Sequence, residues 1–115
     1  MLQIEGFFLL SFAIQLCHSL EELSTGFHRK WYLFKMPFWL FLSFEICFTL
    51  FWFLVLIFRS FPHREELQIF FLILMFANGI QHILWWMMSK KYVPGLITAF
   101  LHAGLFLTFY FSVAA

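Results

Sequence analysis

Residues 36–58 read MPFWLFLSFEICFTLFWFLVLIF, and the only charged residue in this stretch is Glu45. A helix that crosses the hydrocarbon core of a bilayer needs about 20 mostly apolar residues. Pro37 falls in the first turn of such a helix, where the missing N–H costs least. The stretch therefore predicts a membrane-spanning helix.

The composition of the whole chain points to the same solvent. Of its 115 residues, 63% are hydrophobic and 11% are charged. A soluble domain of this size has too little interior to bury so much apolar surface. The net charge of +1 gives no basic footprint for nucleic acid, which is excluded as a partner. Cys17 and Cys47 both lie in apolar runs and are predicted to be free thiols.

Three further apolar runs resemble the first in length. The four predicted spans cover about residues 4–23, 36–58, 67–88 and 96–114. Because the connections are short, neighbouring spans must run antiparallel. We predict an all-α polytopic membrane protein, an antiparallel four-transmembrane-helix bundle that forms one domain over residues 1–115. The first run carries Glu5 and lacks the pattern of a cleaved signal peptide, so it is expected to remain as a span.

The basic residues of the loops predict the orientation of these spans. Most of them follow the first and third spans: Arg29, Lys30, Lys35, Lys90 and Lys91. Only Arg59 and Arg64 lie in the loop after the second span. Since cytoplasmic loops are enriched in Lys and Arg, loops 24–35 and 89–95 are expected in the cytoplasm and both termini outside.

Each predicted span carries one stripe of polar residues. In the first span, Gln15, His18 and Glu22 recur at steps of three and four, which places them on one helix face. Each other span has a pair four residues apart: Glu45 and Thr49, Asn78 and His82, Thr98 and His102. Counted at about 1.5 Å per residue, the three histidines and Glu45 lie about 8–13 Å below the cytoplasmic surface. The four stripes can therefore meet along one bundle axis.

Ionisable side chains at this depth predict a metal site. Such residues are costly in a bilayer, and they usually pair and carry function. Imidazole and carboxylate groups that converge inside a helical bundle can bind zinc, iron or manganese. The expected metal ligands are His18, Glu22, His82 and His102. The expected catalytic acid or base is Glu21 or Glu45. The residues expected to orient the imidazoles or contact the substrate are Gln15, Asn78, Tyr92 and Thr98.

Several of these residues have a structural alternative. Glu21 could reach the interface by snorkelling, and Glu45 could be a protonated structural carboxyl group. His102 could simply form a hydrogen bond with a neighbouring helix, as could Asn78 and Thr98.

Three segments of the chain resemble a known family. The pentapeptide HSLEE at 18–22 resembles the signature of the HXXEE family of small integral membrane proteins. NGIQH at 78–82 and YVPGLITA at 92–99 resemble that family's Asn-x-x-x-His and Tyr-x-Pro-Gly-x-x-Thr-Ala segments, in the same order. The activity of the family is not established. The residues that the resemblance implies as functional are His18, Glu21, Glu22, Asn78, His82 and Thr98, whereas Glu45 and His102 rest on spacing alone.

Three functions fit this pattern. The leading hypothesis is a metal-dependent membrane enzyme that acts on a lipid or other apolar substrate, by hydrolysis with zinc or by oxidation with iron. The second is a metal-free acid/base isomerase, because the paired carboxylates are similar to those of emopamil-binding-type sterol isomerases. The third is a non-enzymatic protein that binds haem or conducts ions. A homodimer is compatible with each of them.

Overall fold

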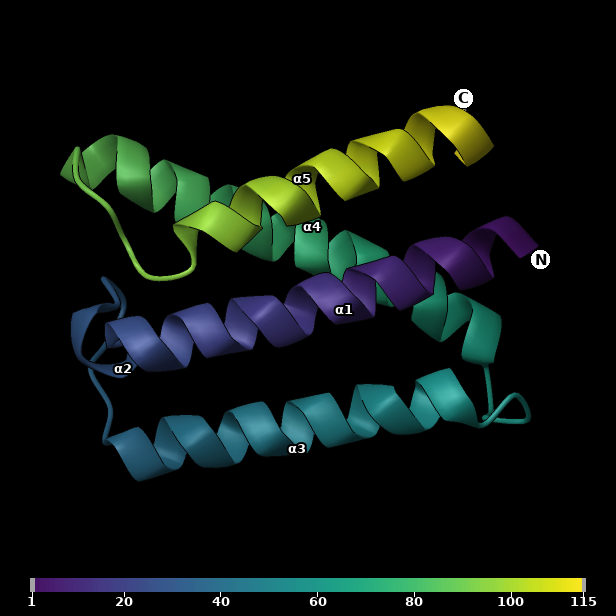
Figure 1. Cartoon of the computed structure of the whole chain (residues 1–115), viewed down its shortest axis with the longest axis horizontal. Coiled ribbons are helices and arrows are strands. Elements are labelled where there is room, and N and C mark those ends of the chain that lie inside the picture. The colour runs from purple at the N-terminus through teal and green to yellow at the C-terminus, as the bar shows by residue number, and fades with distance from the viewer. Residues whose placement is uncertain (1, 115) are drawn as a thin grey trace.

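The computed structural model describes residues 2–114 as an all-helical chain (Figure 1). Its elements are α1 (Leu2–Thr25), α2 (Phe27–Lys30), α3 (Phe38–Ile57), α4 (Arg64–Ser89), α5 (Leu96–Phe109) and the π-helical turn η1 (Tyr110–Ala114). No strand occurs within these described residues. The all-α prediction is therefore confirmed. Within the predicted loop at 24–35, Gly26 adopts φ 82° and α2 forms one helical turn after it.

Three helices are long and apolar enough to cross a membrane: Phe38–Ile57, Arg64–Ser89 and Leu96–Val113. Their bounds agree with three of the four predicted spans to within a few residues. The remaining predicted span, 4–23, is the first along the chain. It lies within α1, which is not among these three helices. Glu21, Glu22 and other polar residues of its stripe reduce its mean hydropathy. The chain is thus consistent with a multi-pass membrane protein, and the number of crossings is supported for three helices.

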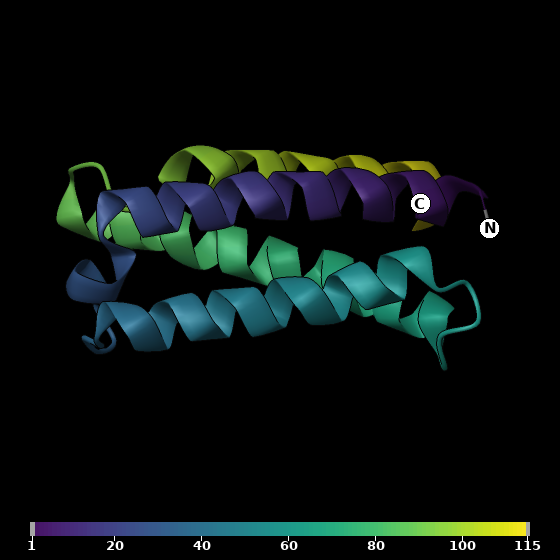
Figure 2. The same cartoon turned by 60° about the horizontal axis from the view of Figure 1, so that its bottom comes forward.

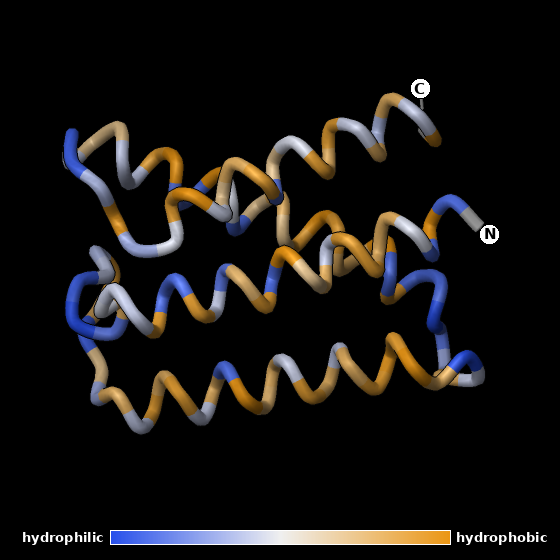
Figure 3. Tube along the Cα trace, viewed as in Figure 1, coloured by the Kyte–Doolittle hydropathy of each residue, from blue (hydrophilic) through white to orange (hydrophobic). Residues whose placement is uncertain are grey.

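The long helices alternate in direction (Figures 1 and 2). In Figure 2, α1 and α5 lie along one side of the molecule and α3 along the other, and α4 crosses obliquely between them. The start of α1 and the end of α5 lie at one end of the molecule, and α2 and the turn at 90–95 lie at the other. Figure 3 shows hydrophilic residues gathered mainly in the connections, with mostly hydrophobic helices between them.

An aromatic cluster holds α1, α3 and α4 together toward the end of the molecule where α1 begins and α5 ends. Phe8 of α1 packs edge-on against Phe71 of α4, with ring centroids 5.4 Å apart. Trp52 of α3 lies against the same ring at 4.7 Å. On the other side of α4, Gly79 allows close contact with α5, since a Cβ there would lie 2.8 Å from the Ala99 carbonyl oxygen. Small residues of this kind commonly permit close helix packing in membranes.

A charged cluster connects the same three helices at the end of the molecule where α1 begins. Arg64 forms a two-point ion pair with Glu5 of α1, and its Nη2 lies 3.0 Å from Glu5 Oε1. The guanidinium also donates to the carbonyls of Val55 and Leu56, at 2.8 and 3.0 Å. The last carbonyls of a helix lack partners within the helix, so Arg64 caps α3. Arg64 was predicted to lie in the loop after the second span. It instead begins α4, and its side chain is largely buried.

We expect Arg64→Gln to lower the free energy of unfolding by about 2 kcal/mol, because it leaves the Glu5 carboxylate and two carbonyls without their charged donor. Thermal unfolding in detergent would measure the change. The matched control is Arg59→Gln, since Arg59 lies 3.8 Å from Glu5 and its side chain is 80% exposed. Exposed pairs contribute little, so the control should stay within about 0.5 kcal/mol of wild type. Equal losses in the two variants would refute the capping role of Arg64.

Candidate metal centre

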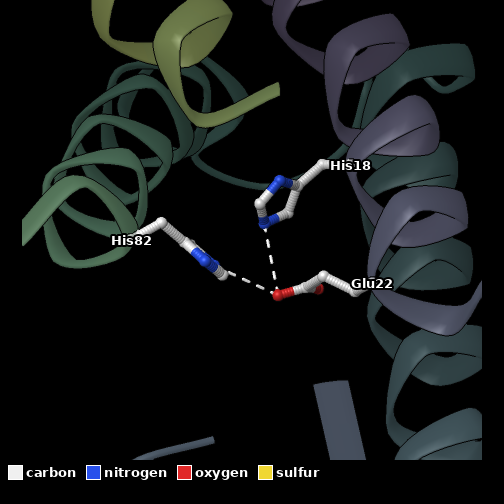
Figure 4. A group of neighbouring side chains, drawn as sticks. All are labelled: His18, Glu22 and His82. Carbon is white, nitrogen blue, oxygen red and sulfur yellow. Dashed lines mark ion pairs between the residues drawn. The ribbon is translucent and has the colours of Figure 1, made fainter. Parts of the chain in front are cut away.

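His18, Glu22 and His82 converge near the α2 end of the helices, and we call these three residues the His/Glu group (Figure 4). A single oxygen, Glu22 Oε2, lies 3.3 Å from His18 Nε2 and 3.1 Å from His82 Nε2. His18 and Glu22 occupy consecutive turns of α1, and His82 faces them from α4. One potential ligand atom of each residue lies within 4.8 Å of the others, and all three side chains are buried.

A hydrogen bond on the far side of the His18 ring indicates which nitrogen of the neutral imidazole carries the proton. His18 Nδ1 lies 2.6 Å from the Thr98 hydroxyl oxygen. That hydroxyl donates its single proton to Glu21 Oε1 at 2.7 Å, so its oxygen must accept the proton of His18 Nδ1–H. A neutral His18 therefore carries its lone pair on Nε2, the nitrogen that faces Glu22.

The near side of the ring agrees with this protonation. Asn78 Nδ2 lies 3.1 Å from His18 Nε2 and donates to it. The orientation of the Asn78 amide is set by Gln81, whose Nε2 donates to Asn78 Oδ1 at 3.0 Å. Gln81 Oε1 in turn accepts the Tyr32 hydroxyl proton at 3.1 Å. In this protonation two acceptors, His18 Nε2 and Glu22 Oε2, lie 3.3 Å apart, and a cation or a proton between them would be favourable.

His82, unlike His18, has no hydrogen bond to either ring nitrogen among the residues that the structure describes, although both nitrogens are buried. A buried polar atom without a partner costs about 1–3 kcal/mol. Neutral imidazole is the commonest metal ligand in proteins, and the mixed nitrogen and oxygen set suits a divalent ion. The chemistry of these three residues therefore fits a metal ion.

Glu21 faces away from the His/Glu group and caps α5. Its carboxylate accepts the backbone N–H groups of Ile97 and Thr98, at 3.1 and 3.0 Å, as well as the Thr98 and Tyr92 hydroxyls. A carboxylate is favourable at a helix N-terminus, where N–H groups lack partners. Burial and the Glu21 hydrogen bond raise the pKa of Tyr92 above its ordinary value, which keeps its hydroxyl a donor. Glu21 thus acts on His18 through Thr98.

The structure does not bring His102 into the His/Glu group. Its Nε2 lies 3.1 Å from Gln15 Oε1 and donates to it, so this nitrogen already has a protein partner. The His102 ring centroid lies 5.5 Å from that of His18. Glu45 of α3 is also buried, and its Oε2 is another polar atom without a partner in the described residues. Gln15, Asn78, Tyr92 and Thr98 all form hydrogen bonds around the centre.

Gly95 is a site residue that the sequence marked only as part of a turn. Its φ of +89° lies in the left-handed region, which favours glycine. A Cβ at this position would lie 2.6 Å from His82 Cε1 and 2.8 Å from His18 Cε1. The backbone before α5 therefore packs directly on both imidazole rings. Its place in the Tyr-x-Pro-Gly segment was the signal that could have identified it.

A cavity of about 730 Å³ lies beside the centre, between α1, α3 and α4. Glu22 and Glu45 both line it, so two carboxyl groups from different helices face one space. Aromatic side chains make up much of the remaining wall, among them Phe41, Phe44 and Phe48. The centre is thus buried from water yet adjacent to an apolar space.

Comparisons with known proteins identify the family of the chain and give no function. The family model described as "Protein of unknown function with HXXEE motif" matches residues 9–111, a range that includes the whole His/Glu group. No curated protein and no solved structure matches the chain. The resemblance seen in HSLEE at 18–22 is confirmed, and the chain belongs to the HXXEE-motif family.

Proposed function

We propose that this protein is a multi-pass membrane enzyme that holds a divalent metal ion at His18, Glu22 and His82 and acts on a lipid or other apolar molecule. The observation that supports it most is that one potential ligand atom from each of these three buried residues lies within 4.8 Å of the others. His18 Nε2 and Glu22 Oε2 are both acceptors 3.3 Å apart, and His82 Nε2 lies 3.1 Å from the same oxygen. A divalent cation bound by all three atoms would balance the negative charge of the buried Glu22 carboxylate.

In this proposal α1 is the fourth membrane crossing. It runs alongside the three helices that are long and apolar enough to span (Figure 1). The basic loops 24–35 and 89–95 lie on the cytoplasmic side and both termini lie outside. The His/Glu group then lies near the cytoplasmic surface, at the depth of the polar linkages of lipids.

The residues of the centre have distinct roles in this enzyme. His18, Glu22 and His82 hold the ion, which is zinc, iron or manganese, and the ion supplies Lewis-acid or redox chemistry when bound. Glu45 is the proposed acid or base, because it lines the same cavity as Glu22 and its Oε2 has no partner among the described residues. Glu21, expected as an acid or base from the sequence, is instead proposed to position His18 through Thr98.

The shared cavity also favours one alternative. Glu22 and Glu45 face a single apolar space, as the paired carboxylates of a metal-free proton-shuttling isomerase would. In that case a proton on Glu22 separates its oxygen from His18 Nε2, and no metal is needed. The two functions differ in one measurable property, the metal content of the purified protein.

Elemental analysis of the protein, purified in detergent through a tag without histidines, tests the proposal. Wild type should contain near-stoichiometric zinc, iron or manganese, and His18→Ala and His82→Ala should contain almost none. His63→Ala is the matched control, because the His63 side chain is 85% exposed, and it should keep the metal. Absence of metal from wild type after reconstitution with each ion would reject the metal enzyme in favour of the proton shuttle.

Thr98→Val should weaken metal binding about 10–100-fold, the usual effect of losing the group that orients a ligand histidine. Valine cannot accept the His18 Nδ1 proton or donate to Glu21, so the protonation of the imidazole is no longer fixed. Thr98→Ser keeps the hydroxyl and should bind nearly as tightly as wild type. Competition with a metal indicator of known affinity would measure both variants, and identical affinities would contradict the positioning role.

A further inference from the structure

Asn78 of α4 directs the N–H side of its amide at a nitrogen that would bind the metal. Its Nδ2 lies 3.1 Å from His18 Nε2 and donates to the lone pair of that nitrogen. An imidazole nitrogen has one lone pair, so it cannot accept this hydrogen bond and bind an ion at the same time. An N–H group that points at a cation is also electrostatically unfavourable. Binding of the ion therefore requires Asn78 to withdraw or to turn its amide over.

Turning over requires almost no space, because the oxygen and nitrogen ends of an amide group have nearly the same size. Half a turn about the Cβ–Cγ bond exchanges Asn78 Oδ1 and Nδ2. The carbonyl oxygen then lies beside His18 Nε2, where the N–H group was before. Amide carbonyl oxygens are ligands of divalent ions in proteins, so the turned side chain can bind the ion that the original orientation repels.

The hydrogen bonds behind Asn78 can reverse together with it. At present Gln81 Nε2 donates to Asn78 Oδ1 at 3.0 Å, and the Tyr32 hydroxyl donates to Gln81 Oε1 at 3.1 Å. If both amides turn over, Asn78 Nδ2 donates to Gln81 Oε1, and Gln81 Nε2 donates to the Tyr32 hydroxyl oxygen. Tyr32 is 45% exposed, so its hydroxyl proton can find a partner outside the helices. The three side chains therefore keep both of their mutual hydrogen bonds.

The distances around His18 Nε2 agree with a shared ion. Asn78 Nδ2 lies 3.1 Å from this nitrogen, and Glu22 Oε2 lies 3.3 Å from it. Glu22 Oε2 also lies 3.1 Å from His82 Nε2. Two ligand atoms that bind one tetrahedral ion at about 2.0–2.1 Å are about 3.3–3.4 Å apart. The turned amide would thus place Oδ1 close to the separation that ligands of one ion require, without movement of a helix.

The cavity beside the centre separates the oxygen-bearing residues from the histidines. Glu22 and Asn78 both line this cavity, whereas its lining within the described part of the chain includes neither His18 nor His82. The imidazoles instead pack against the backbone at Gly95. An ion that arrives through the cavity would therefore meet Glu22 and Asn78 first.

We propose that Asn78 is a fourth protein ligand of the ion and that it binds through Oδ1 after its amide turns over. The inference rests on the proposed function for the presence of the ion, and it adds one ligand to the His/Glu group. Without the ion, Asn78 satisfies the buried His18 Nε2 as a donor. With the ion, the same side chain supplies a neutral oxygen ligand, and the Gln81 and Tyr32 hydrogen bonds reverse.

Two substitutions of Asn78 distinguish a ligand from a donor that competes with the ion. Asn78→Leu removes the oxygen and should weaken metal binding about 100-fold, since loss of a group that merely orients a ligand already costs about 10–100-fold. Asn78→Asp keeps the shape and an oxygen, so it should bind the ion at least as tightly as wild type. If Asn78 were only a donor to His18 Nε2, its removal would free that lone pair. Wild-type or tighter binding by Asn78→Leu would therefore overturn the inference.

Gln68→Leu is the matched control for these titrations. Gln68 is another amide of α4, but it donates to Glu5 at the other end of the molecule, at 3.0 Å. Its substitution should leave the metal affinity at the wild-type value. Circular dichroism of each variant without metal verifies that the helices are formed, so a loss confined to Asn78→Leu reports on the centre.

Isotope-edited infrared spectroscopy observes the carbonyl group of wild type directly. Asn78 is the only asparagine in the chain, so cell-free synthesis with asparagine carrying carbon-13 at the side-chain carbonyl labels a single group. Ligation through Oδ1 should move the labelled band to lower frequency when the ion is added. An amide in its original orientation would still accept from Gln81, and its band would stay in place. A stationary band in metal-loaded wild type would overturn the inference.

The outcomes separate this inference from the proposed function. Absence of metal from wild type would reject the whole centre, and the fourth ligand with it. Stoichiometric metal in wild type, with full affinity in Asn78→Leu and a stationary carbonyl band, would overturn only the role of Asn78. The His/Glu group would then stand as the metal site with three protein ligands.

Discussion

Glu22→Gln should reduce metal affinity by more than about 100-fold, since loss of a mere orienting group already costs 10–100-fold. The substitution keeps the size of the side chain but removes the only anionic ligand of the His/Glu group. It also places an amide beside His18 Nε2 and His82 Nε2, where an N–H donor can satisfy the lone pairs that the ion would otherwise occupy. The helical content should not change.

The preceding residue, Glu21, provides the most direct comparison with Glu22. Glu21→Gln changes the adjacent residue of the same helix but touches the His/Glu group only through Thr98, so a smaller loss, about tenfold, is expected. Glu66→Gln alters a side chain that is 74% exposed and should have no effect. Calorimetric titration with zinc measures all three variants. If Glu21→Gln weakened binding as strongly as Glu22→Gln, the assignment of the ligand carboxylate would be incorrect.

The sequence could predict the His/Glu group because helical periodicity fixes both face and depth. His18 and Glu22 are four residues apart, which places them on one face of any α-helix. His82 follows from the depth count, because antiparallel helices of similar length align their residues by distance from the same surface. Neither inference requires knowledge of side-chain contacts, and the structure brings these three residues together.

Spacing alone could not separate His102 from the His/Glu group. His102 has the right depth and face, but Gln15 lies between α1 and α5 at that level and accepts its Nε2 proton. Which polar group pairs with which depends on interhelical distance and rotamers, and periodicity specifies neither. The same limit applies to Glu21, whose true partners lie 71 to 77 residues away at the start of α5.

The Glu5–Arg64 pair was missed for a different reason. Glu5 lies in the first predicted span and Arg64 in the loop before the third, so the spacing within one helix does not relate them. Opposite charges at the same end of two adjacent helices were the available signal. The Glu5–Arg64 cluster and the His/Glu group differ in their hydrogen bonds. Glu5 has Arg64 and Gln68 as donors, whereas His82 has no hydrogen-bond partner among the described residues. Structural clusters of polar groups are normally satisfied, so the buried His82 nitrogens mark a candidate site.

The second large effect is expected from a substitution outside the ligand set. Gly95→Ala adds one methyl group, which would lie 2.6 Å from His82 Cε1 and 2.8 Å from His18 Cε1. Alanine at a φ of +89° costs about 1–2 kcal/mol, and overpacking typically adds about 1–3 kcal/mol. The protein can reduce this strain only by moving both imidazoles, and such a movement separates the ligand atoms.

We therefore expect Gly95→Ala to lose about 2–5 kcal/mol of unfolding free energy and most of its metal. The matched control is Gly104→Ala in the same helix, because a Cβ there meets no heavy atom within 4 Å. Alanine in a helix interior is favoured over glycine by about 0.5–1 kcal/mol, so the control should be slightly stabilised and keep its metal. Thermal unfolding and elemental analysis of the same samples give both quantities. A Gly95→Ala protein that unfolds like the control and retains the ion would show that the backbone before α5 does not hold the two histidines in place.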